Sequence, residues 1–312
     1  MTLTQLQYTL SVAEHGNFTL AAEKSFVTQP TLSMQVQKLE EELGIKLFHR
    51  NTKPISITTV GVKVLAQAKK IVEESQRLRD VVASEKGIPS GTFSLGIIPT
   101  VLPTLLPMFL KTFVNSYPKV DLKIEELTTK NIIEKIKNGN LDAGIAATPL
   151  NHDSILEKRL YNEPIVGYIP EGHPLNSTQY LKVEDLYNTS ILVLEDGHCF
   201  RENILNLCNI NSASHAPFDI KSGSFETLIL LANEGLGMTL LPYLNTLNLN
   251  PKNKKNLRNF KTPEPAREIS LIHSKNQLKL PTINALTKTI SGIIRGAIEF
   301  DDIKVISPNK KH

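Results

Sequence analysis

A single helical pattern over residues 59–86 sets the organisation of this 312-residue chain. Apolar and small residues recur there in steps of three and four, which is the seam of a coiled coil. The seam consists of Val64, Ala68, Ile71, Ser75, Leu78 and Val82. A core helix of one domain would also carry an apolar stripe, but most residues off this seam are charged or polar. The narrow stripe therefore favours a dimerising linker helix at residues 59–88, followed by turn residues up to Gly91.

Residues 1–58, ahead of the linker, have the pattern of short helices with little strand signal. A first helix ends at Gly16, and Thr19 is expected to cap a second. A third begins at Pro30 and ends at Gly44. Two short extended runs follow, of the size of a wing hairpin. The sequence therefore predicts a mainly α winged helix-turn-helix domain.

The polar face of the third predicted helix suits DNA binding. Short hydroxyl and amide side chains fit base edges, and cations fit phosphates. The candidate residues are Thr31, Ser33, Gln35, Lys38 and Arg50. The simpler interpretation is that this helix belongs to a packed bundle. The two are compatible, because the apolar face packs while the polar face contacts DNA.

From residue 89 to residue 300, strand-like runs alternate with helix-like segments, which predicts an α/β domain with largely parallel sheets. The expected strands are Thr92–Ile98, Val120–Glu126, Leu141–Ala147, Ile165–Ile169, Ile191–Leu194, Met238–Leu241 and Ile269–His273. The expected helices include Thr104–Val114, Asn131–Asn138, Phe225–Asn233 and Thr282–Ile298.

Composition limits the classes of protein that fit. The chain is 40% hydrophobic and 21% charged, which is ordinary for a globular protein, and no apolar run approaches the roughly 20 residues that span a bilayer. The N-terminus lacks the features of a signal peptide, so we expect a cytoplasmic chain with no membrane partner. A net charge of +4 does not establish nucleic-acid binding by itself. Two cysteines and His198 are too few ligands for a zinc site, and no metal or cofactor is expected.

The two cysteines, Cys199 and Cys208, lie nine positions apart in a segment with a helical apolar pattern. Nine residues of helix separate two Cα atoms by roughly 13 Å and place the side chains on opposite faces. A disulfide requires Cα atoms within about 7 Å. If this pair bonds, the helix must unwind, so the pair has the properties of a switch. The alternative is a pair of half-buried structural cysteines, the usual situation of a free cysteine.

The order of residues near the N-terminus resembles the signature of LysR-type transcriptional regulators. The resemblance rests on Ala21, Ala22, Val27, Gln29, Pro30, Thr31, Leu32, Ser33, Val36, Leu39, Glu40, Leu43, Gly44, Leu47, Phe48, Arg50, Thr58 and Gly61. It extends over essentially the whole chain and implies a linker helix followed by a regulatory domain of two α/β subdomains similar to periplasmic binding proteins.

That resemblance also implies boundaries and partners. Subdomain I would comprise about 89–163 and 267–300, subdomain II about 164–266, and residues 301–312 would be a tail. Thr28, Gln29 and Pro30 would join the DNA-binding residues. The expected partners are a double-stranded DNA operator, further copies of the chain in a homotetramer built as a dimer of dimers, and RNA polymerase.

Within that family, the run from Leu194 to Cys199, with Arg201 and Cys208, resembles the thiol segment of the peroxide-sensing members. This implies that hydrogen peroxide oxidises Cys199 to a sulfenic acid and that Cys208 then closes an intramolecular disulfide. The disulfide would change oligomer packing and DNA contacts and so control oxidative-stress genes, most simply as an activator, although the sequence leaves the balance of activation and repression open. A reductant of the glutaredoxin or thioredoxin type would reset the switch. His198 and Arg201, beside Cys199, are expected to lower the pKa of the thiol.

The same resemblance implies that distant residues converge on Cys199. The hydroxyls of Thr100 and Thr129, with Thr128 as an alternative to Thr129, would hold the peroxide oxygens. Arg267 would stabilise the thiolate or the leaving oxygen. Taken without the family, each is more simply a strand-end cap or a surface charge.

Three other functions compete with peroxide sensing. A LysR-type regulator that binds a small organic effector between its subdomains would make the cysteines incidental, and its inducible response would survive Cys199→Ser. A thiol-dependent enzyme, such as a peroxidase or a Cys–His hydrolase, would show turnover, but the helix-turn-helix argues against an enzyme. A secreted solute-binding protein would share the regulatory fold, but the N-terminal module and the missing signal peptide argue against it.

Overall fold

The computed structural model describes residues 1–312 except 86, 188, 209–221, 299–302 and 310–312. The chain divides into two compact units, Met1–Glu85 and Lys86–His312. Among the described residues, no helix has the length and apolarity needed to cross a membrane.

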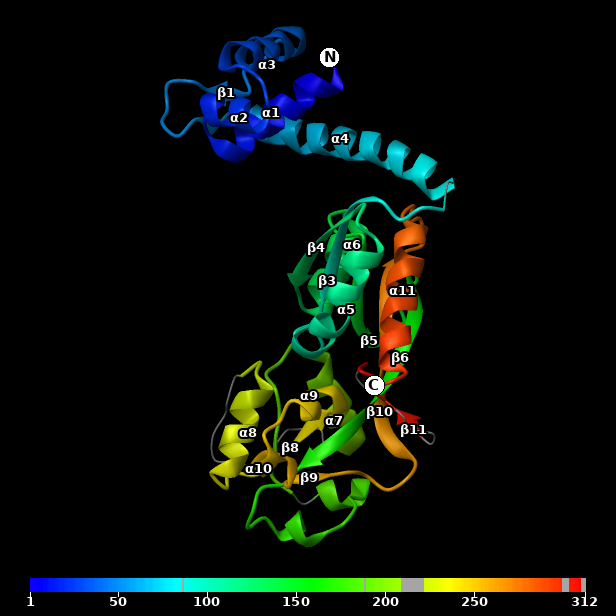
Figure 1. The fold of residues 1–312 in the computed structure, drawn as a ribbon. Helices are drawn as coiled ribbons and strands as arrows, with labels where there is room; N and C mark the ends of the chain where they lie inside the picture. Colours follow the sequence, from blue (N-terminus) through cyan, green and yellow to red (C-terminus); the bar gives the residue numbers. More distant parts are fainter. Residues whose placement is uncertain (86, 188, 209–221, 299–302, 310–312) are drawn as a thin grey trace. The chain divides into compact units, whose positions relative to one another are not determined.

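The N-terminal unit begins with three helices and a short hairpin (Figure 1). They are α1 (Leu3–His15), α2 (Phe18–Lys24), α3 (Gln29–Leu43), β1 (Phe48–His49) and β2 (Ser56–Ile57). Gly16 and Gly44 end α1 and α3 in the left-handed conformation, which glycine adopts at no steric cost. Asn17, not Thr19, caps α2: its side chain accepts from the backbone amides of Thr19 and Leu20.

The core of this unit explains why the helices pack as a helix-turn-helix. Leu32, Val36 and Leu39 lie on one face of α3 and are fully buried. They join buried residues of α1 and α2 in one apolar cluster. The opposite face of α3 is left exposed, as predicted for a helix that packs on one side only.

The long helix α4 (Thr59–Glu85) follows the hairpin and matches the predicted linker. Its first turns pack on the N-terminal core through Leu65 and Ala68. Further along, two seam residues, Leu78 and Val82, are 70% and 53% exposed in the single chain. Apolar seam positions that one chain leaves uncovered fit the prediction of a dimerising helix, which stays a prediction.

The C-terminal unit is built on a mixed sheet, with helices between its strands (Figure 1). Its strands are β3 (Gly91–Ile97), β4 (Val120–Glu126), β5 (Ala143–Thr148), β6 (Ile155–Tyr168), β7 (Ile191–Leu192), β8 (Met238–Pro242), β9 (Leu257–Arg258), β10 (Glu264–Ser274) and β11 (Ile303–Val305). Its helices are α5 (Leu102–Ser116), α6 (Thr129–Lys137), α7 (Cys199–Cys208), α8 (Phe225–Asn233), α9 (Tyr243–Leu247), α10 (Pro251–Lys254) and α11 (Leu280–Ile294), with 3₁₀ turns η1 (Pro174–Ser177) and η2 (Val183–Leu186).

The prediction of largely parallel sheets is wrong for the middle of this unit. Strand order among the described residues is β4-β3-β5-β10-β6-β8-β7, with β11 on β10 and β9 on β6. β3 is parallel to β4 and β5, and β7 is parallel to β8. However, β10 is antiparallel to β5 and β6, and β6 is antiparallel to β8 and β9. The two long strands β6 and β10 were predicted only as their apolar segments.

Two apolar cores divide the unit into a first and a second subdomain. The first core includes Phe93, Phe109, Phe113, Ile145 and Leu271. The second includes Tyr168, Leu186, Phe200, Leu228 and Phe260. β6 and β10 supply residues to the first core, and β6 continues into the second, so the two subdomains share a continuous strand.

The prediction that residues 301–312 form a tail is wrong for its middle part. Residues 303–305 form β11, which pairs in parallel with the start of β10. The following Ile306 packs against the second core, and its backbone N–H donates to the carbonyl of Ala266 at 2.7 Å. A strand of three residues with a lysine at its centre carries too little apolar pattern to be predicted.

Candidate thiol site and DNA-binding helix

Cys199 is the first residue of α7 and lies where the two subdomains meet. The helix packs its apolar face on the second core, while Cys199 packs against the first core. The hydroxyl oxygen of Thr129, the first residue of α6, lies 2.8 Å from the Cys199 sulfur. Thr128 instead caps α6, its side chain accepting from the backbone amide of Asn131. Of the two threonines considered, Thr129 is therefore the one that contacts the thiol.

Arg267 is fully buried on β10, and its guanidinium is fixed from three sides. Its Nε and Nη2 donate to Glu163 Oε2 at 2.9 and 2.8 Å. Its Nη1 donates to the Thr100 hydroxyl at 2.9 Å, and Nη2 also donates to the Thr100 carbonyl at 3.0 Å. The guanidinium carbon lies 5.1 Å from the ring centroid of Phe200, the residue after Cys199. A buried cation is thereby held next to the start of α7.

Glu163 and Phe200 are parts of this arrangement that sequence reasoning missed. Glu163 is 1% exposed, and its second oxygen accepts from the backbone amide of Leu244 at 3.0 Å. The available signal was a lone carboxylate in the apolar run from Leu160 to Ile169. A buried charge is rarely tolerated without a partner, so such a residue indicates a buried cation nearby.

The thiol of Cys199 does not have the lowered pKa that its sequence neighbours predicted. Burial raises its pKa above the ordinary value, while the Thr129 hydrogen bond and the charge of Arg267 act in the opposite direction. The Arg201 side chain instead donates to the Leu194 carbonyl and lies 2.9 Å from Asp196. The ring of His198 lies 3.9 Å from Glu195. The cation that acts on the thiol is therefore Arg267, not Arg201 or His198.

Cys208, at the other end of α7, is 1% exposed and belongs to the second core. Burial raises its pKa to about 12. Both cysteines are free thiols, and the helix between them is continuous, as the sequence predicted. In this state Cys208 is not a nucleophile, because the reactive form of a cysteine is the thiolate. Residues 209–217, into which a rearranged helix would continue, lie outside the described part of the chain.

The residues predicted to contact DNA lie along α3 and the turn before it. Thr28, Gln29, Pro30, Thr31 and Lys38 are exposed, as a DNA-contacting set requires. Ser33 and Gln35 are half-buried and already engaged within the unit: Ser33 accepts from Arg50 at 3.4 Å, and Gln35 accepts from Gln5 at 3.2 Å.

Arg50 is more than a surface cation. It donates to the fully buried carboxylate of Glu40 at 3.1 Å, and its guanidinium carbon lies 5.1 Å from the Phe18 ring centroid. The other oxygen of Glu40 accepts from the backbone amide of Leu47 at 2.8 Å, which ties the hairpin to α3. Sequence reasoning did not assign a role to Glu40.

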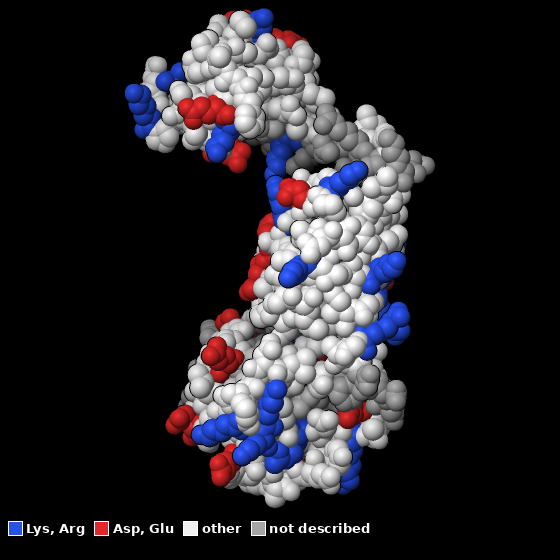
Figure 2. Space-filling model, in the orientation of Figure 1, with Lys and Arg blue, Asp and Glu red and all other residues white. Residues whose placement is uncertain are grey.

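Surface charge gives little further guidance to DNA binding. On the face drawn in Figure 2, lysines and arginines are interspersed with acidic residues rather than forming one continuous basic field. This agrees with the small net charge of +4. The case for DNA binding rests on the helix-turn-helix.

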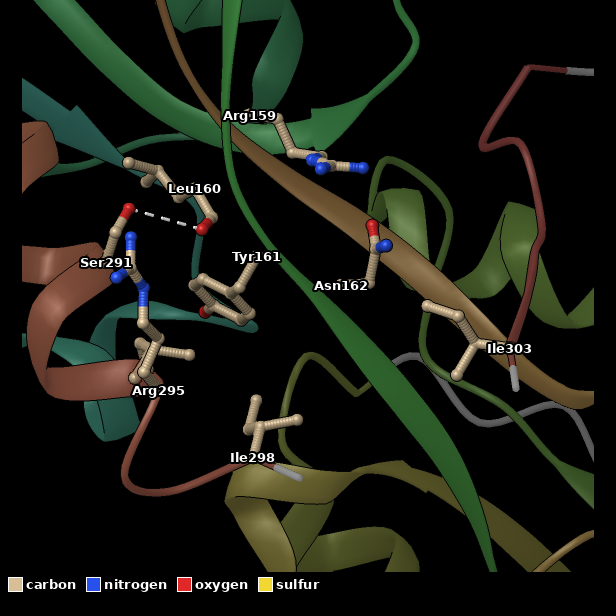
Figure 3. Close-up of a pocket in the computed structure, with 9 residues that line it drawn as sticks. Arg159, Leu160, Tyr161, Asn162, Ser291, Arg295, Ile298 and Ile303 are labelled. Carbon is tan, nitrogen blue, oxygen red and sulfur yellow. Dashed lines mark hydrogen bonds between the residues drawn. The ribbon is translucent and has the colours of Figure 1, made fainter. Parts of the chain in front are cut away.

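A separate hollow of about 400 Å³ lies beside β6 and α11 (Figure 3). The hollow is lined by Arg159, Tyr161 and Asn162 of β6, by Ser291 of α11, and by Arg295, which directly follows α11. The Tyr161 hydroxyl is buried without a hydrogen-bond partner in the described residues, and burial raises its pKa well above the ordinary value. None of the residues predicted for the thiol site lines this hollow.

Comparison with known families identifies the chain. Residues 3–62 match the bacterial regulatory helix-turn-helix proteins of the lysR family, and residues 86–292 match the LysR substrate-binding domain. The chain belongs to the LysR family of transcriptional regulators. The predicted fold class, a helix-turn-helix and linker helix before a regulatory domain like periplasmic binding proteins, is thereby confirmed.

Individual relatives show which members of the family this chain is similar to. The chain is 32% identical over 277 residues to the DNA-binding transcriptional dual regulator OxyR of Escherichia coli K12, covering 88% of this chain and 89% of that protein. It is 30% identical over 299 residues to the hydrogen peroxide-inducible genes activator of Pectobacterium carotovorum, covering 96% and 99%. Its fold matches a hydrogen peroxide-bound mutant of Corynebacterium glutamicum OxyR with a TM-score of 0.67, at 28% identity, over 95% of this chain and 93% of that one.

Proposed function

We propose that this regulator binds operator DNA through α3 and the β1–β2 wing and senses hydrogen peroxide at Cys199, activating oxidative-stress genes. The relatives named as peroxide-inducible activators support this function, as does the relative solved with peroxide bound. In this proposal residues 1–58 bind DNA, residues 59–88 dimerise, and 89–300 form the regulatory domain, completed by β11. Its working form is a homotetramer that contacts RNA polymerase.

The observation that carries the proposal is the contact between Thr129 and Cys199 beside the buried Arg267. A hydroxyl has one hydrogen to donate and two lone pairs to accept with, so Thr129 can bind sulfur or a peroxide oxygen. The Thr100 hydroxyl accepts from Arg267 and keeps its own hydrogen for a peroxide oxygen. A fixed buried cation stabilises negative charge that develops on the leaving oxygen.

The first chemical step oxidises Cys199. Its thiolate attacks one oxygen of hydrogen peroxide, an S–O bond forms, the O–O bond breaks, and the departing hydroxide takes up a proton to leave as water. The sulfur loses two electrons and becomes a sulfenic acid. The raised pKa keeps most of Cys199 protonated at neutral pH, so Arg267 and Thr129 act on the small reactive fraction and on the transition state.

The second step forms the disulfide and requires α7 to unwind. The Cys208 thiolate attacks the oxidised sulfur, an S–S bond forms, the S–O bond breaks, and hydroxide leaves as water with the proton from Cys208. With a pKa of about 12, Cys208 gains a useful thiolate fraction only after leaving the second core. A thiol reductant reverses the step by exchange, becoming oxidised itself. The new packing alters the contacts between subunits and with DNA.

Peptide mass spectrometry after a brief, near-stoichiometric pulse of hydrogen peroxide tests this function. The expected product is an intramolecular Cys199–Cys208 link, absent from Cys199→Ser and Cys208→Ser, with a changed footprint on operator DNA only in the wild type. If the thiols stay free, or oxidise only slowly in excess peroxide, the proposal fails, and the chain is a LysR-type regulator of another signal.

For DNA binding, Lys38→Ala is expected to weaken the affinity about equally for all DNA sequences and to reduce the salt dependence of that affinity.

A further inference from the structure

The residues after α11 contact the helix that carries both cysteines. β11 pairs with residues Glu264 to Ala266 of β10, the three residues directly before Arg267 (Figure 1). The chain then passes along α7, and Asn309 donates from its side-chain amide to the carbonyl of Pro149 at 2.9 Å. Pro149 directly follows β5 of the first subdomain. The segment 303–309 therefore joins β10, α7 and the first subdomain.

Two asparagines of α7 make the contacts to this segment. Asn203 is fully buried and donates to the Ile306 carbonyl at 2.6 Å. Asn206 donates to the carbonyls of Ser307 and Asn309 at 2.8 and 2.7 Å. Beside these bonds a hollow of about 350 Å³ lies between η2, the end of α7 and the segment. Hydrogen bonds, rather than close packing alone, thus hold this end of α7 to the segment.

The positions of these asparagines relate them to the cysteines. Residues 199, 203 and 206 follow the i, i+4, i+7 spacing and share one face of α7, whereas Cys208 lies on the opposite face. The disulfide therefore requires α7 to unwind between Cys199 and Cys208, the stretch that contains both asparagines. Unwinding that reaches Asn203 and Asn206 breaks the three hydrogen bonds to the segment, because the bonds depend on the helical placement of both asparagines.

We propose that residues 303–309 are a latch that holds α7 helical and sets the rate at which Cys208 reaches oxidised Cys199. Asn203 and Asn206 are positioning residues of the second step, and the latch leaves the first reaction with peroxide unaffected. This inference rests on the proposed function for its role in signalling. The contact itself is independent of that function and can be tested without peroxide.

The first test is peptide-resolved amide hydrogen exchange of α7 in the reduced, full-length protein. Asn206→Ala is expected to raise exchange in residues 203–208 about tenfold, since it removes two hydrogen bonds from the helix. A chain ended at residue 302 is expected to show a larger increase. Asn176→Ala is the matched control, because the Asn176 amide also donates to two carbonyls in the second subdomain, away from α7.

The second test measures the rate of disulfide closure by mass spectrometry. Closure is driven in one experiment by hydrogen peroxide and in another by diamide, which oxidises pairs of thiols. Diamide forms an adduct with one thiol, and the other thiol then attacks this sulfur, forms the disulfide and releases the reduced hydrazine. Asn206→Ala is expected to close about tenfold faster than wild type with either oxidant. In a Cys208→Ser background it is expected to leave the rate of the first peroxide step unchanged.

The outcomes separate the latch from the proposed function. Unchanged exchange in both Asn206→Ala and the shortened chain overturns the latch, and so does raised exchange with unchanged closure by diamide. Failure of Cys199 to react with peroxide overturns the proposed function alone, since exchange and diamide closure still decide the latch. The latch is also overturned if Asn176→Ala raises amide exchange in α7 as much as Asn206→Ala does.

Discussion

The same arrangement of four groups occurs in both units of this chain. Its arginine is partly exposed in one unit and fully buried in the other. In each, one oxygen of a buried glutamate accepts from a backbone amide and the other from an arginine. In each, the guanidinium carbon lies 5.1 Å from the centre of a phenylalanine ring. The N-terminal set is Glu40, Leu47, Arg50 and Phe18, and the C-terminal set is Glu163, Leu244, Arg267 and Phe200.

The difference between the sets is the exposure of the arginine. The Arg50 side chain is 36% exposed, whereas that of Arg267 is 1% exposed. Water and salt screen the charge of Arg50, which remains available to a phosphate at the surface. The field of Arg267 is screened much less and acts on Cys199. The same local chemistry thus fixes a surface cation in one unit and polarises a thiol in the other.

The largest expected difference between the sets is in stability. Glu163→Ala leaves Arg267 as an unpaired buried cation and is expected to lower the free energy of unfolding by about 3–5 kcal/mol. Glu40→Ala is expected to cost about 1–3 kcal/mol, because Arg50 can turn to water and only the Leu47 amide loses its buried partner. Amide exchange resolved by peptide measures each unit separately. Equal costs in the two units would contradict the distinction drawn from burial.

Replacing each arginine tests the electrostatic part of the comparison. Arg267→Met removes a positive charge that lowers the pKa of Cys199, so the pKa is expected to rise further and the thiolate fraction at neutral pH to fall. The check is the pH profile of thiol loss with peroxide in a Cys208→Ser background, which should move to higher pH. Arg50→Met is the matched control and should leave the profile unchanged. Adding Glu163→Gln to Arg267→Met removes the uncompensated carboxylate and separates misfolding from loss of charge.

The hydroxyl at Cys199 acts on the same thiol through a hydrogen bond. Thr129→Val keeps the shape of the side chain but removes a hydrogen bond that lowers the pKa of the thiol. The rate of the first peroxide step at neutral pH is expected to fall about tenfold. Thr128→Val, which removes the cap of α6 instead, should cost stability and leave the pH profile in place. The assignment of Thr129 fails if the two variants react alike.

The smallest effect concerns Cys208 at alkaline pH. Its folded pKa of about 12 lies above the ordinary value of 9.0, so the folded state retains a proton that the unfolded state loses. The resulting stabilisation is complete below pH 9 and is lost as pH rises toward 12. Relative to Cys208→Ala, the reduced wild type should lose roughly 1 kcal/mol of unfolding free energy by pH 10. A difference that stays constant from pH 7 to 11 would show that Cys208 is not buried in the reduced state.

Much of the fold was predictable because the relevant signals are local. Periodicity and end signals located α3 and α4, and the run from Phe225 to Asn233 was predicted with the bounds of α8. The long strands were not, because polar residues such as Glu157 and Asn162 interrupt the apolar pattern where β6 passes through the sheet. β11 was missed because its pairing with β10, rather than its own sequence, makes it a strand.

The thiol site, too, was predictable from the residues themselves only where the signal is local. The apolar pattern of residues 200–207 predicted a helix, the nine-residue spacing put the two thiols on its opposite faces, and α7 is that helix. The convergence of Thr129 and Arg267 on Cys199 came from the family resemblance alone, since contacts over such separations leave no local pattern. The direction of the pKa shift was predicted wrongly because adjacency in sequence does not say where a side chain points. Arg201 turns to the Leu194 carbonyl, and burial outweighs the charge that does reach the thiol.

We propose that the buried Cys199 thiol reacts with peroxide despite its raised pKa, because Thr129 and Arg267 stabilise the charges of this reaction. The most direct measurement is the second-order rate constant of Cys199 with hydrogen peroxide in Cys208→Ser, with free cysteine measured alongside at the same pH. We predict that Cys199 reacts faster than free cysteine and that Arg267→Met removes this advantage. A rate no faster than that of free cysteine, or one that Arg267→Met leaves unchanged, would contradict the account.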